Sequence, residues 1–411
     1  MKRIWIAATI AALALGAAPA AAELCTIDAV PAATLLLPYF EVDLGKNNFR
    51  KVEQTIISLQ NAGAAPALAH VTLWTDLSVP TLSFDVFLTG FDVEEINLAE
   101  LFYTGGIRGL QGADFTRGFV LGQTPSGGIQ SRGLLIQAHR GEPVGGPGGD
   151  CYGVPTGDNV ARGYVTIDNV SEPSTLFPSD SGYFGSNGVA NDINQLWGVV
   201  LVKLNKALQA DLLVSVEAGD FGSNDYTFYG RYVGFDGSDG REPLGRKWAA
   251  RYFSGAERTD LVVWRDSTAV QEPFDCDELG QAGWYPLEQT QAIAFNEFEE
   301  GLELFVDVPQ DQPLPGLPSD QPMDPGFPAE TQRIRVVSPQ IGTGPFRSGW
   351  IYLDLEDPDL PTQSLVWVRQ GFRKRAALYP GLPWYDVSNG GSPADGTACG
   401  RAPRRTLLPI P

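Results

Sequence analysis

Short strand-like runs separated by turn residues constrain the fold of this chain most strongly. Segments such as TLLLPYF, HVTLW, YVTIDNV and SLVWVRQ are rich in Val, Ile, Leu and aromatic residues, and they often alternate in polarity. The chain carries 47 Gly and 31 Pro, many of which fall between these runs. Helical periodicity is scarce, with short candidates in VEEINLAELF and QTQAIAFNEFEE. The pattern predicts an all-β protein built from Ig-like β-sandwiches.

Three pairs of similar segments predict an internal repeat. TLLLPYFEVDLG (34–45) resembles DLLVSVEAGDFG (211–222), HVTLWTD (70–76) resembles DLVVWRD (260–266), and SRGLLIQA (131–138) resembles RSGWIYLD (347–354). Their order is preserved while the offset grows from 177 to 190 to 216 residues. We therefore expect two tandem modules related by duplication. Trp74 and Trp264 should then occupy equivalent, largely buried positions.

The limits of the two modules are predicted from turn-rich and Pro-rich stretches. The length of 411 residues suggests two or three domains. The turns near 179–195 place the boundary between an N-terminal module at 23–190 and a C-terminal module at 191–411. The second module carries a Pro-rich insertion at 308–329, which cannot continue a central strand. That segment is alternatively an interdomain linker.

The first 22 residues have the pattern of an export signal. Lys2 and Arg3 precede an apolar run at 4–16, and a small-residue cleavage site at 20–22 stands before Glu23. The longest later apolar run, 197–204, falls well short of the ~20 residues that span a bilayer. The sequence predicts a secreted or periplasmic protein whose mature chain begins near Glu23.

The charge of the mature chain argues against nucleic acid as a partner. Loss of Lys2 and Arg3 with the signal leaves 27 basic and 49 acidic residues, a net charge of −22. A field of that sign repels phosphate backbones.

All four cysteines lie in the predicted mature chain. An even number in an exported protein predicts two disulfides, for which three connectivities exist. The near-equal separations of 126 and 123 residues favour Cys25–Cys151 and Cys276–Cys399, one bridge in each module. On this pairing no catalytic thiol is expected.

Histidine and carboxylate residues are the candidates for hydrolytic chemistry. A histidine-based triad would need His70 or His139, yet no serine lies in a Gly-x-Ser-x-Gly elbow. Both histidines are therefore predicted to be structural or on the surface. A glycosidase needs two carboxyls about 5 to 10 Å apart. The acidic candidates near strand ends are Glu41, Asp43, Asp76, Asp85 and Asp266. Carboxylates at strand ends are more commonly turn formers, so no catalytic residue is assigned.

Metal and cofactor sites are not predicted. GGPGGDCYG (145–153) fits the calcium-binding nonapeptide of β-rolls, but it occurs once, and those rolls need stacked copies. A flexible loop is the simpler interpretation. DGSDG (236–240) and EDPDLP (356–361) supply too few oxygen ligands for an EF-hand type of site.

Tryptophans are the remaining candidates for binding, because exposed indoles stack on sugars. The candidates are Trp74, Trp197, Trp248, Trp264, Trp284, Trp350, Trp367 and Trp384. Tryptophan within strand alternation usually packs into the core. Trp384, in LYPGLPWYDV (378–387), is the least strand-like and is the predicted ligand-binding residue.

Several phrases carry a resemblance to other proteins. With LLLPYFEVD (35–43), HVTLWTD (70–76), REPLGRKWAARY (241–252) and TDLVVWRD (259–266), the chain resembles a group of exported bacterial β-rich proteins that has no assigned activity. The resemblance implies bacterial origin and export, and it carries over no catalytic residues.

The sequence as a whole favours a non-catalytic exported protein with a structural, adhesive or ligand-binding role. A pair of carbohydrate-binding modules is the first alternative, and a carboxylate-dependent glycoside hydrolase is the second. The expected partner is a glycan or a cell-surface component.

Overall fold

The structure is a computed structural model. It describes residues 31–107, 131–185, 187–204, 207–212, 214–216, 225–235, 241–253, 257–268, 272–276, 291–303, 329–336, 346–372, 375–380 and 382–383. The predicted export signal lies outside these residues, as do Cys25, Cys399, Trp284, Trp384 and all of the Pro-rich insertion except Ala329.

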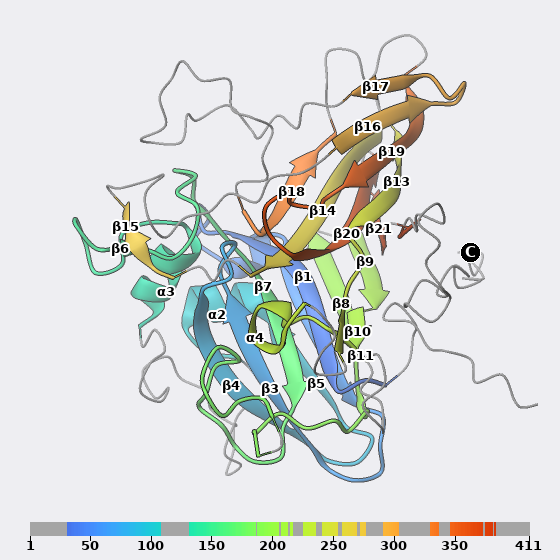
Figure 1. The fold of residues 1–411 in the computed structure, drawn as a ribbon. Helices are drawn as coiled ribbons and strands as arrows, with labels where there is room; N and C mark the ends of the chain where they lie inside the picture. The colour runs from blue at the N-terminus through green and yellow to red at the C-terminus, as the bar shows by residue number, and fades with distance from the viewer. Residues whose placement is uncertain are drawn as a thin grey trace, which may run out of the picture.

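The first β-sandwich pairs a five-stranded sheet with a four-stranded sheet (Figure 1). The larger sheet has the order β10-β1-β7-β3-β4, and the smaller has the order β5-β2-β8-β9. In chain order the strands are β1 (Thr34–Asp43), β2 (Gln54–Asn61), β3 (Ala67–Trp74), β4 (Pro80–Leu88), β5 (Val93–Asn97), β7 (Val160–Asn169), β8 (Leu196–Leu204), β9 (Ala207–Leu212) and β10 (Val214–Val216).

The second β-sandwich is built from later strands of the chain. Its five-stranded sheet has the order β22-β13-β19-β16-β17, and its four-stranded sheet has the order β18-β14-β20-β21. The strands are β13 (Lys247–Phe253), β14 (Glu257–Ser267), β16 (Gln291–Asn296), β17 (Gly301–Glu303), β18 (Thr331–Arg335), β19 (Ser348–Asp354), β20 (Thr362–Phe372), β21 (Arg375–Pro380) and β22 (Leu382–Pro383).

The two sandwiches share one topology. The strands of the two sandwiches can be matched one to one in chain order, beginning with β1 to β13 and β2 to β14. With this matching, both sheet orders of the first sandwich become those of the second. All strand pairs within the four sheets are antiparallel. The all-β prediction is confirmed.

The apolar content of β1 explains its burial. Leu35, Leu36 and Leu37 are all buried, and burial alternates only from Tyr39 to Asp43. The register of β1 with β7 shifts between Leu37 and Phe40. Pro38 lies at that shift, as expected for a residue that cannot donate a ladder hydrogen bond.

Helices lie mainly between β5 and β7 of the first sandwich. α2 (Leu98–Thr104) begins after Asn97, whose side chain accepts from Glu100 N, and ends at Gly105 in the left-handed region. α3 (Arg132–His139) is capped by Ser131, and a short 3-10 helix, η1 (Phe49–Lys51), precedes β2. Between the sandwiches lie β11 (Asp225–Thr227), α4 (Gly230–Val233) and β12 (Arg241–Pro243).

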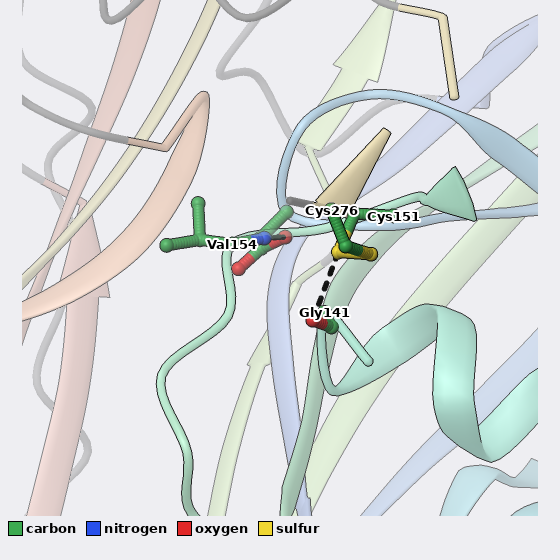
Figure 2. The surroundings of a disulfide bond; sticks show 5 residues. Gly141, Cys151, Val154 and Cys276 are labelled. Atoms are coloured by element: carbon green, nitrogen blue, oxygen red, sulfur yellow. Dashed lines mark hydrogen bonds between the residues drawn. A yellow bond between two sulfur atoms is a disulfide. The ribbon is translucent and has the colours of Figure 1, made fainter. Parts of the chain in front are cut away.

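A disulfide links the two sandwiches, contrary to the expected pairing within each module. Cys151 ends β6 (Asp150–Cys151), and Cys276 follows β15 (Phe274–Asp275), which pairs with β6. The Cys151 sulfur lies 3.2 Å from the Gly141 carbonyl oxygen (Figure 2). Equal spacing along the chain misled the prediction, because the loops that carry these cysteines meet in space.

The predicted boundary and segment matches also need correction. The boundary at 190/191 falls within the first sandwich, because β8 pairs with β2, and β10 pairs with β1. In the first matched pair of segments, β1 and β10 are therefore neighbours in one sheet. In the last, 131–138 falls on helix α3 and its N-cap, while 347–354 contains strand β19. Trp74 and Trp264 are both about 1% exposed, as predicted, but they lie on β3 and β14, which are not equivalent strands.

The hydrophobic core runs without a break from one sandwich to the other. A single cluster of buried side chains includes Leu35 and Val165 of the first sandwich and Val263 and Ile351 of the second. Among the described residues, no helix combines the length and the apolar character that crossing a membrane requires.

Candidate functional site

An aromatic stack joins the two sandwiches at the ends of β3 and β14. Trp74 lies parallel to Tyr164 of β7, with ring centroids 5.6 Å apart and 2° between the planes. Trp264 meets the same Tyr164 edge-on at 5.9 Å. The Trp74 indole donates to Thr166 Oγ1 at 2.8 Å. The two Trp-x-Asp phrases thus meet at one junction, around a shared tyrosine.

Backbone hydrogen bonds continue the junction beyond Trp74. The Asp76 carbonyl oxygen accepts from Glu330 N at 2.8 Å and from Thr331 N at 3.1 Å, where β18 begins. The Thr331 hydroxyl donates to the Pro38 carbonyl oxygen. The start of strand β18 is therefore held by hydrogen bonds to β1 and to the turn that follows β3.

Buried charges surround this contact. Arg231 of α4 donates through Nε to Asp266, and its Nη2 donates to Glu330 at 2.7 Å. All three side chains are at most 2% exposed. Gln363 Nε2 also donates to Asp266, at 2.7 Å. Charges this deeply buried need such partners to be tolerated.

Two carboxyls at the junction have raised pKa values. Burial raises the pKa of Glu330 to about 7, although Arg231 and the Ser78 hydroxyl favour its charged form. Burial also raises the pKa of Asp76 to about 7, against the hydrogen bond from Val154 N. Ser78 is itself fixed by the Tyr164 hydroxyl at 2.9 Å. Two acids at one interface thus titrate near neutrality.

A pocket opens between the first sandwich and strands β14, β18 and β20 of the second. It is a shallow, open depression: the space open to the centres of water-sized spheres is about 30 Å³, and the wider empty volume of about 420 Å³ includes open solvent. We call it the junction pocket. Its apolar wall consists of Leu37, Phe40, Val200, Val202, Val262 and Trp367. Its polar wall consists of Tyr39, Glu41, Glu53, Thr55, Arg333 and Arg369.

The charges in the junction pocket are complementary across the two sandwiches. Arg333 of β18 pairs with Glu41, and Arg369 of β20 pairs with Glu53 at 2.5 Å. Arg369 also lies 3.9 Å from Glu41. The first sandwich supplies the carboxylates and the second supplies the guanidinium groups. These four side chains are 16 to 23% exposed, so they are partly accessible to a ligand.

Tyr39 adds a neutral donor to the junction pocket. Its hydroxyl donates to Glu41 Oε2 at 3.1 Å. Burial, reinforced by Glu41, raises the pKa of Tyr39, which keeps the phenol protonated. The pocket therefore offers a phenol, two carboxylates and two guanidinium groups above an apolar wall.

Both histidines are buried, so neither lies on the surface. His70 Nδ1 lies 2.6 Å from Asp85 Oδ1. His139 lies between the Arg162 carbonyl oxygen and the Thr81 hydroxyl, at 2.7 and 2.8 Å. Burial lowers the pKa of His139 to about 4, so its ring is neutral at pH 7.

Each of the five candidate carboxylates has a different partner. Glu41 pairs with Arg333, Asp85 with His70, and Asp266 with Arg231. Asp43 accepts from Gly45 N at 2.8 Å in a turn. Asp76 accepts from Val154 N at 3.0 Å. Of these five, only Glu41 lines the junction pocket.

The tryptophan and metal candidates fall mainly in the core or in turns. Trp74, Trp248, Trp264 and Trp367 are at most 3% exposed, and partly buried Trp350 packs on Phe295. Trp197 is also partly buried. In 356–361 the Asp357 side chain accepts from two backbone amides of its own turn. Across the described part of the chain, no group of three or more His, Cys, Asp and Glu could hold a metal ion.

The arginines of the junction were missed by the sequence reasoning. Arg231, Arg333 and Arg369 lie far apart in the chain, and they meet acids of another segment. One local signal was present: Arg333 and Arg369 each stand within an apolar strand run, where an unpaired charge would be costly.

Comparison with protein-family models, curated proteins and solved structures gave no match.

Proposed function

We propose that this is an exported, non-catalytic binding protein whose ligand site is the junction pocket. The observation that carries the proposal is the composition of that pocket. Paired Glu and Arg side chains stand partly exposed over an apolar wall at the contact between two sandwiches. Binding sites are commonly concave, largely apolar and provided with a few convergent polar groups.

The rigidity of the junction supports a binding role. The Cys151–Cys276 disulfide and the shared core join the two sandwiches, and the buried Arg231–Asp266 pair ties α4, which lies between them in the chain, to β14. A preorganised site loses less conformational entropy when it binds. The disulfide also supports export to an oxidising compartment, the periplasm or the medium. The shared strand order supports an origin of the two sandwiches by duplication.

A small polyhydroxylated ligand, such as a sugar, fits this chemistry best. Carboxylate and guanidinium groups provide acceptors and donors for hydroxyl groups, and Tyr39 adds a phenol. The apolar wall would pack against the carbon-bound hydrogens of a sugar ring. A glycoside hydrolase is less well supported, because Glu41 and Glu53 are both engaged by arginine.

Calorimetric titration of the purified mature chain with monosaccharides and short oligosaccharides tests the proposal. We expect binding by the wild type and loss of binding in Arg369→Met, which removes the guanidinium group and keeps an apolar stem. Arg251→Met is the matched control, since Arg251 forms an exposed pair with Glu297 away from the pocket.

Two results would count against the proposal. Absence of binding across a glycan array and in calorimetry would remove the sugar ligand. Binding that is equally affected by Arg369→Met and Arg251→Met would place the ligand elsewhere. Release of a reducing sugar from an oligosaccharide would instead support the hydrolase.

A further inference from the structure

Phe91 is displayed to solvent in a strained backbone conformation. It is 69% exposed, and its φ of 59° lies in the left-handed region, which a bulky aromatic residue rarely adopts. Such residues persist where their surroundings over-determine them, and they cluster at functional sites. Glycine would adopt this backbone conformation without strain, yet the residue here is phenylalanine.

The turn that carries Phe91 is firmly built. Asp92 Oδ2 accepts from Thr89 N at 3.1 Å and from Thr89 Oγ1 at 2.9 Å. Phe91 N donates to the Gly63 carbonyl oxygen at 2.9 Å. Asn61 Nδ2 donates to the Thr89 carbonyl oxygen at 2.9 Å. The ring is thus presented by a rigid support.

Three turns form one continuous surface at this end of the β5-β2-β8 sheet. Gly90 packs so closely on residue 64 that a Cβ would lie 2.1 Å from the Ala64 carbonyl oxygen. Ala62 N donates to the Gln195 carbonyl oxygen at 2.8 Å. The turn at 61–66 therefore contacts both the turn at 89–93 and the segment at 193–195.

This surface is mostly apolar. Besides Phe91, Val93 is 52% exposed and Ile193 is 55% exposed. The turn at 61–66 adds the exposed residues Ala62, Ala64, Ala65 and Pro66. We call Phe91, Val93, Ile193 and this turn the apolar tip. Contiguous exposed apolar patches of this kind mark interaction sites.

The two chain segments that form the apolar tip carry charge of one sign. Residues 52–107 and 163–202, which form the turns, the strands β2 to β5 and most of β7 and β8, contain no Lys or Arg. The exposed acids Glu95 and Asp192 stand beside Val93 and Ile193. Any partner that covers the tip therefore meets a negative field that no basic residue of these two segments offsets.

We propose that the apolar tip docks a polypeptide partner that is both basic and apolar. The aromatic ring is the anchor, and the surrounding carboxylates select positive charge. A second copy of this chain would bring the same acidic rim against itself. An anionic lipid surface would be repelled in the same way. The inference is independent of the junction pocket.

Surface plasmon resonance of the full mature chain over an immobilised peptide of alternating Lys and Leu tests the inference. A Glu/Leu peptide of the same length is the reference surface. We expect wild-type binding that weakens as salt is raised. In Phe91→Gly the affinity should fall on the order of tenfold or more, as for a hot-spot aromatic.

Two further variants make the experiment decisive. Phe91→Gly should melt no lower than the wild type, because glycine adopts positive φ without strain. Phe298→Ala removes an equally prominent ring, 76% exposed at the β16–β17 turn, and should leave binding unchanged. Equal binding of wild type and Phe91→Gly, or no binding to the Lys/Leu peptide, would overturn the proposal. Phe91-dependent binding to phosphatidylglycerol vesicles, or Phe91-dependent dimerisation, would also overturn it.

Discussion

Gly163 and Gly349 occupy equivalent positions in the two sandwiches, on β7 and β19. A Cβ on Gly163 would lie 2.0 Å from the Trp74 carbonyl oxygen, and a Cβ on Gly349 would lie 1.8 Å from the Phe295 carbonyl oxygen. Each glycine precedes an aromatic residue that packs on the neighbouring strand: Tyr164 on Trp74, and Trp350 on Phe295. The same close strand contact is thus built twice.

Alanine at either glycine should destabilise the protein. The added methyl group would overlap a backbone atom, so the strands must move apart. We expect Gly163→Ala and Gly349→Ala each to lower the free energy of unfolding by about 3 kcal/mol or more, measured by urea denaturation. Gly133→Ala is the control. Gly133 lies in α3 with open space around its Cα, so alanine there should be neutral or stabilising. Tolerance of Gly163→Ala would contradict the packing.

Stability should depend on pH through Asp76. Burial raises the pKa of Asp76 to about 7 from 3.8, so the folded state holds a proton that the unfolded chain releases. The stabilisation is therefore complete below pH ~4 and is lost as the pH rises to ~7. Thermal unfolding between pH 4 and 8 should show a flatter profile for Asp76→Asn than for the wild type. At pH 8 the variant should be more stable by a few kcal/mol.

The control for this effect is an exposed acid. Asp192→Asn also removes one negative charge, but at an exposed position. It should therefore leave the shape of the pH profile unchanged. If Asp192→Asn and Asp76→Asn flatten the profile equally, net charge rather than burial determines the pH dependence.

Breaking the buried ion pair at the junction should be costly. Asp266→Ala would leave Arg231 with Glu330 as its remaining acidic partner in a site that is at most 2% exposed. The expected loss is about 3 to 5 kcal/mol in the free energy of unfolding. Denaturation with urea measures it. Glu297→Ala, which removes the exposed partner of Arg251, should have little measurable effect. Similar losses in both variants would show that the burial of the junction pair is unimportant.

Fold class was predictable from the sequence, but the correct internal matches were not. Strand periodicity identified β-sheets, and the burial of Trp74 and Trp264 followed from strand alternation. Short apolar strands resemble one another by composition. The sequence comparison therefore matched two segments whose strands are neighbours in one sheet instead of equivalent strands of the two sandwiches. The segments that occupy equivalent positions in the two sandwiches are GYVTIDN (163–169) and GWIYLDL (349–355). In each, a glycine precedes an aromatic residue and alternation follows.

The junction site was not predictable, because its contacts join distant segments. Glu41 and Arg333 are 292 residues apart, and Glu53 and Arg369 are 316 residues apart. No local pattern indicates which acid meets which base over such distances. The disulfide shows the same limit, since spacing along the chain carried no information about the approach of β6 to β15.

Peptide mapping without reduction is the most direct test of the two-sandwich account. The structure predicts a disulfide-linked peptide pair that contains Cys151 and Cys276, which ties the sandwiches together around the junction. Reduction should then lower the stability by roughly 4 to 5 kcal/mol, as expected for a closed loop of this length. Recovery of Cys25 linked to Cys151 and of Cys276 linked to Cys399 would contradict the account, because each sandwich would then be closed on itself.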